Sequence, residues 1–193
     1  MPFAKNWMEE LVIEWLQIDG FLAESNLPVA VTQVGGRFEA DVVGAKIYKN
    51  VMEIRHIETG SLASGAESVA AVQKKFSDDI KASIEKYFKI KFGYPDSTIN
   101  YEKMYIASFS TIPVETQLAS HGIKVIRLMD FLFSHVFPTI QRWKDNPPHQ
   151  PKNRGSYITL SEAHWLLQLL DFMHSRDGLK QPANKKEATK QPL

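Results

Sequence analysis

Hydrophobic and polar positions follow two different periods along this chain, and the changes of period mark its elements. Three- and four-residue spacing, typical of amphipathic helices, covers five segments: 7–19, 66–91, 113–120, 129–143 and 160–175. Strand-like runs occupy 28–34, 37–43, 51–57, 103–109 and 123–128. This order predicts an α/β fold with a mixed sheet, and the helix between the last two strands predicts that they are parallel.

The pattern predicts a single domain over residues 1–176, with a core at 7–128 and a helical extension at 129–176. Residues 177–193 form a polar, lysine-rich tail, which predicts disorder. The 193 residues include no cysteine, which excludes disulfides, thiolate metal sites and cysteine catalysis. No apolar run is long enough to cross a bilayer, and the N-terminus lacks a signal-peptide core, so we expect a cytoplasmic protein.

Charge is distributed unevenly. Residues 1–60 carry five Lys and Arg against nine Asp and Glu, a balance of −4, and residues 61–193 carry eighteen against thirteen, a balance of +5. The net charge is therefore +1. This asymmetry suits a polyanionic ligand that approaches a metal held by acidic residues, and solvated surface charge explains it as well.

Acidic residues interrupt two of the strand-like runs. Successive side chains of a strand point to opposite faces, so Asp41 takes the opposite face from Val42, and Glu53 shares a face with Arg55. The segment 44–50 is short enough to close an antiparallel hairpin that brings Asp41 and Glu53 together. Two close carboxylates repel unless a cation lies between them, which predicts a metal site. The alternative is an exposed hairpin face with a cross-strand ion pair.

The segments EADVVG, with Asp41, and MEIRH, with Glu53-Ile54-Arg55, resemble the PD-(D/E)xK nuclease superfamily, and MEELVIEWLQIDGF resembles the first helix of its resolvase-like members. The resemblance covers roughly residues 7–128. It implies a restriction endonuclease-like fold and Mg²⁺-dependent hydrolysis of DNA phosphodiester bonds, with Mn²⁺ as a substitute. DNA is then the expected partner, no membrane is expected, and a homodimer is compatible because many such nucleases are dimers.

The resemblance also implies site residues. Asp41, Glu53 and the main-chain carbonyl of Ile54 correspond to the Mg²⁺ ligands of the family. Glu9, or its neighbour Glu10, corresponds to a helix acid that assists with a second metal ion. The alternative is that Glu9 and Glu10 bind no metal and are first-turn acids that complement the helix dipole.

Arg55 occupies the position where the family has lysine. Arginine stays protonated, so it can stabilise charge on the scissile phosphate but cannot accept a proton. Three outcomes stay open. In the first, Arg55 supplies the electrostatic part of catalysis and activity is retained. In the second, the site is inactive and the chain is a nucleic-acid-binding or assembly subunit. In the third, the lysine lies elsewhere, at Lys46, Lys49, Lys74 or Lys75. A further class of function is an α/β protein-interaction domain without a metal site.

Overall fold

The computed structural model describes residues 6–31, 37–62, 66–96, 98–147, 160–176 and 178–179, so nearly all of the predicted disordered tail lies outside the described residues. Within these ranges, five strands form one sheet: β1 (Leu22–Val31), β2 (Arg37–Tyr48), β3 (Val51–Ser61), β4 (Thr98–Phe109) and β5 (Ile123–Arg127). Their spatial order is β1-β2-β3-β4-β5. The first three strands are antiparallel, and β3, β4 and β5 are parallel. The mixed α/β sheet and the parallel last pair are therefore confirmed.

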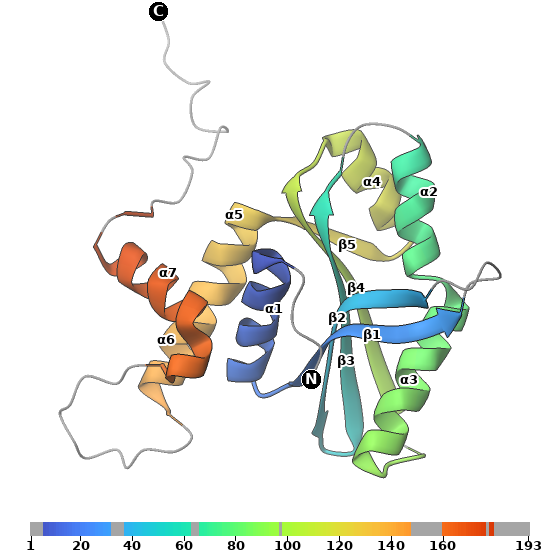
Figure 1. Cartoon of the computed structure of the whole chain (residues 1–193), viewed down its shortest axis with the longest axis horizontal. Helices are drawn as coiled ribbons and strands as arrows, with labels where there is room; N and C mark the ends of the chain where they lie inside the picture. Colours follow the sequence, from blue (N-terminus) through green and yellow to red (C-terminus); the bar gives the residue numbers. More distant parts are fainter. Residues whose placement is uncertain are drawn as a thin grey trace, which may run out of the picture.

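Helices cover both faces of the sheet (Figure 1). On one face, α1 (Trp7–Ile18) and α5 (Leu128–Phe131) pack on the sheet, and α6 (Phe137–Asp145) and α7 (Trp165–Ser175) pack against α1. The other face is covered by α2 (Ala66–Lys75), α3 (Asp78–Phe92) and α4 (Ile112–Ser120). Strand alternation explains the two layers. Val42 and Ile57 pack in the core with α1, whereas Val43 and Ile54 pack in the core with α3. Within the described part of the chain, no helix is both long and apolar enough to cross a bilayer.

Two predicted helices are interrupted. The helix predicted at 66–91 is two helices, because Ser77 takes the N-cap position of α3 and the acids Asp78 and Asp79 follow it. The helix predicted at 129–143 contains a π-helical turn, Leu132–Val136, between α5 and α6. Pro138 follows at once and lacks the N–H that an unbroken α-helix needs there.

The C-terminal helices are attached to α1 through buried polar groups. The carboxylate of Glu14 accepts hydrogen bonds from the main-chain N–H groups of Leu166 (3.2 Å) and Leu167 (2.8 Å), at the start of α7. Glu14 is buried, and this burial raises the pKa of its carboxyl. The indole N–H of Trp15 also donates to Thr139 of α6 over 3.2 Å. Helices α1, α6 and α7 therefore share one core.

Candidate functional site

The register of the hairpin between β2 and β3 decides which acids meet. A two-residue turn, Lys49-Asn50, joins the strands, with positive φ angles of 48° and 64° that suit a tight hairpin turn. Tyr48 therefore faces Val51, and Val42 faces Ile57. The next position before Val42 is Asp41, and the next after Ile57 is Glu58. Asp41 thus meets Glu58.

The predicted pairing of Asp41 with Glu53 is wrong. Glu53 faces Lys46 across the hairpin, and their side chains form an ion pair of 3.3 Å. Glu53 lies five positions before Glu58 on the same strand, so strand alternation turns the two side chains to opposite faces of the sheet. The proposed third ligand, the carbonyl of Ile54, lies at the Glu53 end of β3 and does not join Asp41 either.

Arg55 and Glu9 also belong to the other face. The guanidinium of Arg55 lies 2.9 Å from Asp19 and over the rings of Trp15 and Phe21, at 4.9 and 4.3 Å from the ring centroids. It therefore fixes the end of α1 to the sheet. Glu9 lies in α1 and accepts hydrogen bonds from Asn6 (2.6 Å) and Asn26 (3.4 Å). The structure does not bring either side chain to Asp41 as the sequence predicts.

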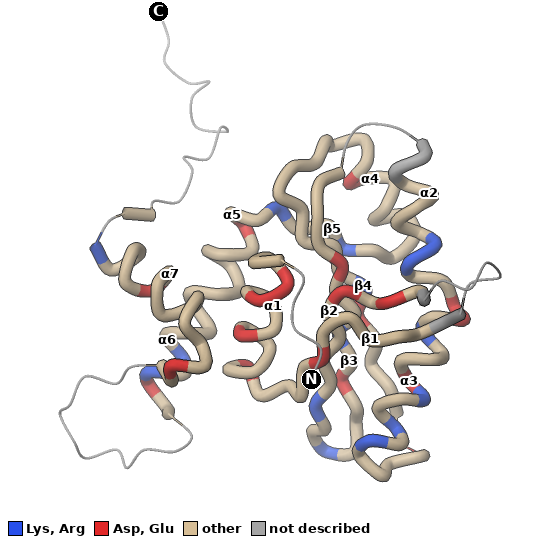
Figure 2. Tube along the Cα trace, in the orientation of Figure 1, with Lys and Arg blue, Asp and Glu red and all other residues tan. Residues whose placement is uncertain are grey.

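The structure instead brings Asp41 together with Glu58 and Lys75. The ammonium of Lys75, the last residue of α2, lies 3.4 Å from Asp41 Oδ1 and also contacts Glu58 Oε2. Glu58 is fully buried, whereas Asp41 and Lys75 are partly exposed. Figure 2 shows basic positions at the end of α2 beside acidic positions of the central strands. The Lys75 ammonium thus contacts both carboxylates.

The main chain at this point is held by the same carboxylates. The regular pairing of β2 with β3 ends at Val42 and Ile57. Just beyond it, Asp41 Oδ2 accepts the N–H of Thr59 over 3.0 Å, and Glu58 Oε1 accepts the N–H of Asp41 over 3.3 Å. Side chains therefore replace the sheet hydrogen bonds, and this fixes the orientation of both acids.

A buried histidine, His56, contacts the carboxylate of Glu58. His56 Nε2 lies 3.0 Å from Glu58 Oε1, and His56 Nδ1 lies 3.0 Å from the hydroxyl of Tyr101. A neutral imidazole has one donor and one acceptor nitrogen. The arrangement therefore fits a phenol that donates to Nδ1 and an Nε2–H that donates to the carboxylate.

The pKa values of the three charged groups in the cluster shift in different directions. Burial, followed by the nearby charge of Glu58, raises the pKa of Asp41 to about 6. Burial also opposes ionisation of Glu58, but the contacts with His56 and Lys75 outweigh it and hold the pKa of that carboxyl below its usual value. The pKa of Lys75 is raised because the charge of Glu58 outweighs the effect of burial. Lys75 is therefore protonated, and the negative charge of the two acids is incompletely compensated.

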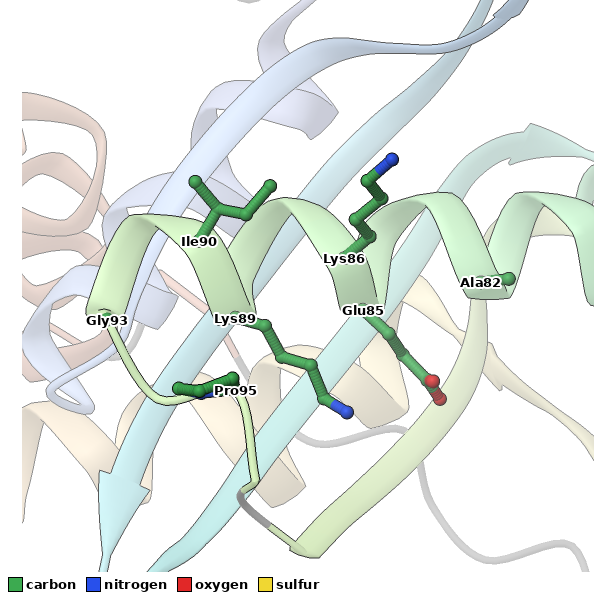
Figure 3. Close-up of a pocket in the computed structure, with 7 residues that line it drawn as sticks. All are labelled: Ala82, Glu85, Lys86, Lys89, Ile90, Gly93 and Pro95. Atoms are coloured by element: carbon green, nitrogen blue, oxygen red, sulfur yellow. The ribbon is translucent and has the colours of Figure 1, made fainter.

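A cavity of about 230 Å³ opens beside Lys75 and is lined by Ser61, Leu62, Ala71, Val72, Lys75 and Tyr105. A larger cavity of about 460 Å³ lies against α3 and includes Glu85, Lys86, Lys89 and Ile90 (Figure 3). We assign the site to the smaller cavity because Lys75, which contacts both acids, lines it. The acid that lines the larger cavity, Glu85, forms a partly exposed ion pair with Lys81 at 3.7 Å.

The donor set limits which cation fits. Within the described ranges, no group of three or more His, Cys, Asp and Glu side chains is arranged to hold a metal ion. Asp41 and Glu58 offer hard oxygen atoms and already hold a cation, the Lys75 ammonium. Mg²⁺ suits two carboxylates because it keeps several of its waters. The two acids therefore fit Mg²⁺ by charge and ligand type.

The searched family models and curated proteins include no match to this chain. A solved structure described as "Protein of Unknown Function AF1548" is 14% identical, with a TM-score of 0.40, and the alignment covers 75% of this chain and 71% of that one.

Proposed function

We propose that this protein is a metal-dependent nuclease that hydrolyses DNA phosphodiester bonds at the cluster of Asp41, Glu58 and Lys75. The observation that carries the proposal is the position of the Lys75 ammonium against both carboxylates, at the wall of an open cavity. The PD-(D/E)xK pattern asks for two acids and a lysine at one place. Here the lysine comes from α2, as in the third outcome that the sequence left open, and the second acid is Glu58 rather than Glu53.

Each residue has a defined part in this proposal. Asp41 and Glu58 would hold Mg²⁺, which when bound neutralises charge on the phosphate and activates water for attack. Their main-chain hydrogen bonds, to Thr59 and to Asp41 itself, keep the oxygen atoms in place before substrate arrives. Lys75 stays protonated and has a flexible stem, so its ammonium can turn to a phosphate oxygen once another cation compensates the acids.

The test compares three acids that differ in position but not in charge. Cleavage of supercoiled plasmid and of single-stranded DNA is measured with Mg²⁺ and with Mn²⁺ for the wild type, Asp41→Asn, Glu58→Gln and Glu53→Gln. We expect Asp41→Asn and Glu58→Gln to lower the rate about 100-fold or more, since an oriented carboxylate is lost while the amide preserves the shape. Glu53→Gln should cleave like the wild type because Glu53 lies on the opposite face.

Two results would reject the proposal. Undiminished cleavage by Glu58→Gln, with folding confirmed by circular dichroism, would exclude this cluster as the catalytic site. A wild-type protein that binds DNA in a salt-sensitive way but never cleaves it would favour the alternative of a non-catalytic nucleic-acid-binding or assembly subunit.

A further inference from the structure

Tyr105 lies beside the acid pair, although neither the resemblance nor the cluster assigns it a function. It is the register partner of Glu58 across the parallel strands β3 and β4, so the two side chains share a face of the sheet. Tyr105 is 6% exposed, and it lines the cavity beside Lys75. A tyrosine hydroxyl is thus placed next to the reacting centre of the proposed nuclease.

Gly60 makes room for this hydroxyl. A Cβ atom at position 60 would lie 2.8 Å from Tyr105 Oη, closer than real Cβ atoms come. The φ angle of Gly60 is +153°, which side chains of L residues rarely adopt. The sequence Glu58-Thr59-Gly60 therefore combines an acid of the site with the space that the phenol occupies.

The Tyr105 hydroxyl keeps hydrogen-bonding capacity for a ligand. Among the described residues, no hydrogen bond to it is found. Burial raises the pKa of Tyr105, against the opposing effect of Lys75, so the phenol stays protonated and can donate. In the described part of the chain, Tyr105 Oη is not one of the buried polar atoms that lack a partner, so this hydroxyl is accessible to an acceptor that enters the cavity.

Both polar and apolar residues line the cavity beside Lys75. Lys75, Tyr105 and Ser61 supply a cation and two hydroxyl groups, and Leu62, Ala71 and Val72 supply apolar contacts. Its volume of about 230 Å³ corresponds to about eight waters at roughly 30 Å³ each. That space suits an anionic group with a small apolar body, such as a phosphate with its sugar, and is too small for a base pair.

We infer that this cavity binds one sugar-phosphate unit of the DNA strand beside the bond that is cut, with Tyr105 Oη donating to its phosphate and Val72 packing on the deoxyribose. The inference rests on the proposed nuclease function and adds to it the subsite that positions the strand. Tyr105 is then a positioning residue, and the bond-breaking step belongs to the acid pair.

Binding can be measured without cleavage. The full chain is titrated with thymidine 5′-phosphate, thymidine and inorganic phosphate, in Mg²⁺, by calorimetry. The variants are Tyr105→Phe, Ala71→Leu and, as a matched control, Tyr87→Phe. Tyr87 donates instead to Glu24 over 3.1 Å, away from the cavity. Ala71 is exposed on α2, so leucine there fills the cavity without removing a polar group.

We expect thymidine 5′-phosphate to bind the wild type and Tyr87→Phe equally, with about 5- to 15-fold weaker binding to Tyr105→Phe. Ala71→Leu should bind it weakest. Equal binding of thymidine 5′-phosphate to the wild type and Tyr105→Phe would overturn the inference. So would thymidine that binds as well as its phosphate, or inorganic phosphate that binds as well as the nucleotide, because either result removes the need for a sugar-phosphate subsite.

Cleavage kinetics separate this inference from the function on which it rests. If the wild type cleaves DNA, Tyr105→Phe should raise KM about 5- to 15-fold with little change in kcat. An unchanged KM would reject the subsite and leave the nuclease proposal intact. Selective nucleotide binding by a wild type that never cleaves DNA would reject the nuclease proposal and retain the subsite.

Discussion

Lys75 Nζ lies 3.4 Å from Asp41 Oδ1 and contacts Glu58 as well, so one ammonium on α2 compensates two carboxylates on neighbouring strands. Glu58 has no exposed surface, and an ionised group in such a place is costly without a partner. The contact therefore couples the stability of the fold to the chemistry of the site.

Removal of the ammonium should destabilise the protein and make it depend on metal. We expect Lys75→Met to lower stability by roughly 2–4 kcal/mol, because it leaves Glu58 buried without its cation, and Mn²⁺ should restore much of this. Thermal unfolding midpoints are measured with and without Mn²⁺, and Lys74→Met, on the exposed side of the same helix, is the control. A Lys75→Met midpoint that Mn²⁺ does not move would contradict a metal site here.

The raised pKa of Asp41 predicts a pH dependence with a definite sign. The folded protein holds the proton of Asp41 up to about pH 6, and an unfolded chain releases it near pH 4. Stability is therefore lost as the pH rises from about 4 to 6, since the folded state binds more protons over that window. We expect metal-free Asp41→Asn to be more stable than the wild type at pH 8 by about 1–2 kcal/mol, allowing for partial exposure.

Below about pH 4 the two proteins should unfold at the same temperature, because Asp41 is then neutral in both states. A constant difference between them from pH 3.5 to pH 8 would show that the charge of Asp41 does not cause the effect.

Arg55→Lys distinguishes the two assignments of the missing lysine. If Arg55 stood at the catalytic position, lysine there should increase cleavage. The structure places Arg55 on the opposite face, between Trp15, Phe21 and Asp19, so we expect no gain of activity. We also expect a loss of roughly 1–2 kcal/mol in stability, since lysine forms weaker stacking and bidentate contacts. A large gain of cleavage would return the site to Glu53 and Arg55.

His56 should control the metal affinity of Glu58. Loss of its Nε2–H leaves Glu58 Oε1 with only the longer hydrogen bond from the main-chain N–H of Asp41, so His56→Ala should weaken Mn²⁺ binding about 10- to 100-fold in a thermal titration. His56→Gln retains an N–H donor and should recover part of the affinity. His121→Ala, which changes an exposed histidine, should bind Mn²⁺ as the wild type does.

The sheet could be predicted from the sequence because each strand and helix carries its own periodicity. The site could not, because it depends on one turn. The prediction treated 44–50 as the loop of the hairpin, whereas the chain turns only at Lys49-Asn50. With the turn there, the partner of Asp41 is Glu58, and the local match of Glu53-Ile54-Arg55 to a motif becomes irrelevant.

Two signals in the sequence favoured the correct register. Lys49-Asn50 lies between two strand-like runs, and asparagine adopts the left-handed conformation more readily than most residues. Glu58 follows His56 and Ile57 at the end of the third run, where an acid has to find a partner if the strand is covered on both faces. The contribution of Lys75 depends on how α2 packs, and no local pattern contains that information.

The hydrogen bonds from Leu166 and Leu167 to Glu14 have a practical consequence for truncation. A recombinant fragment that stops before residue 160 would retain the whole sheet but lose the two main-chain donors of this carboxylate and expose the side of α1 on which α7 packs. Deletion studies that aim to isolate a minimal folded unit therefore need an end point beyond α7.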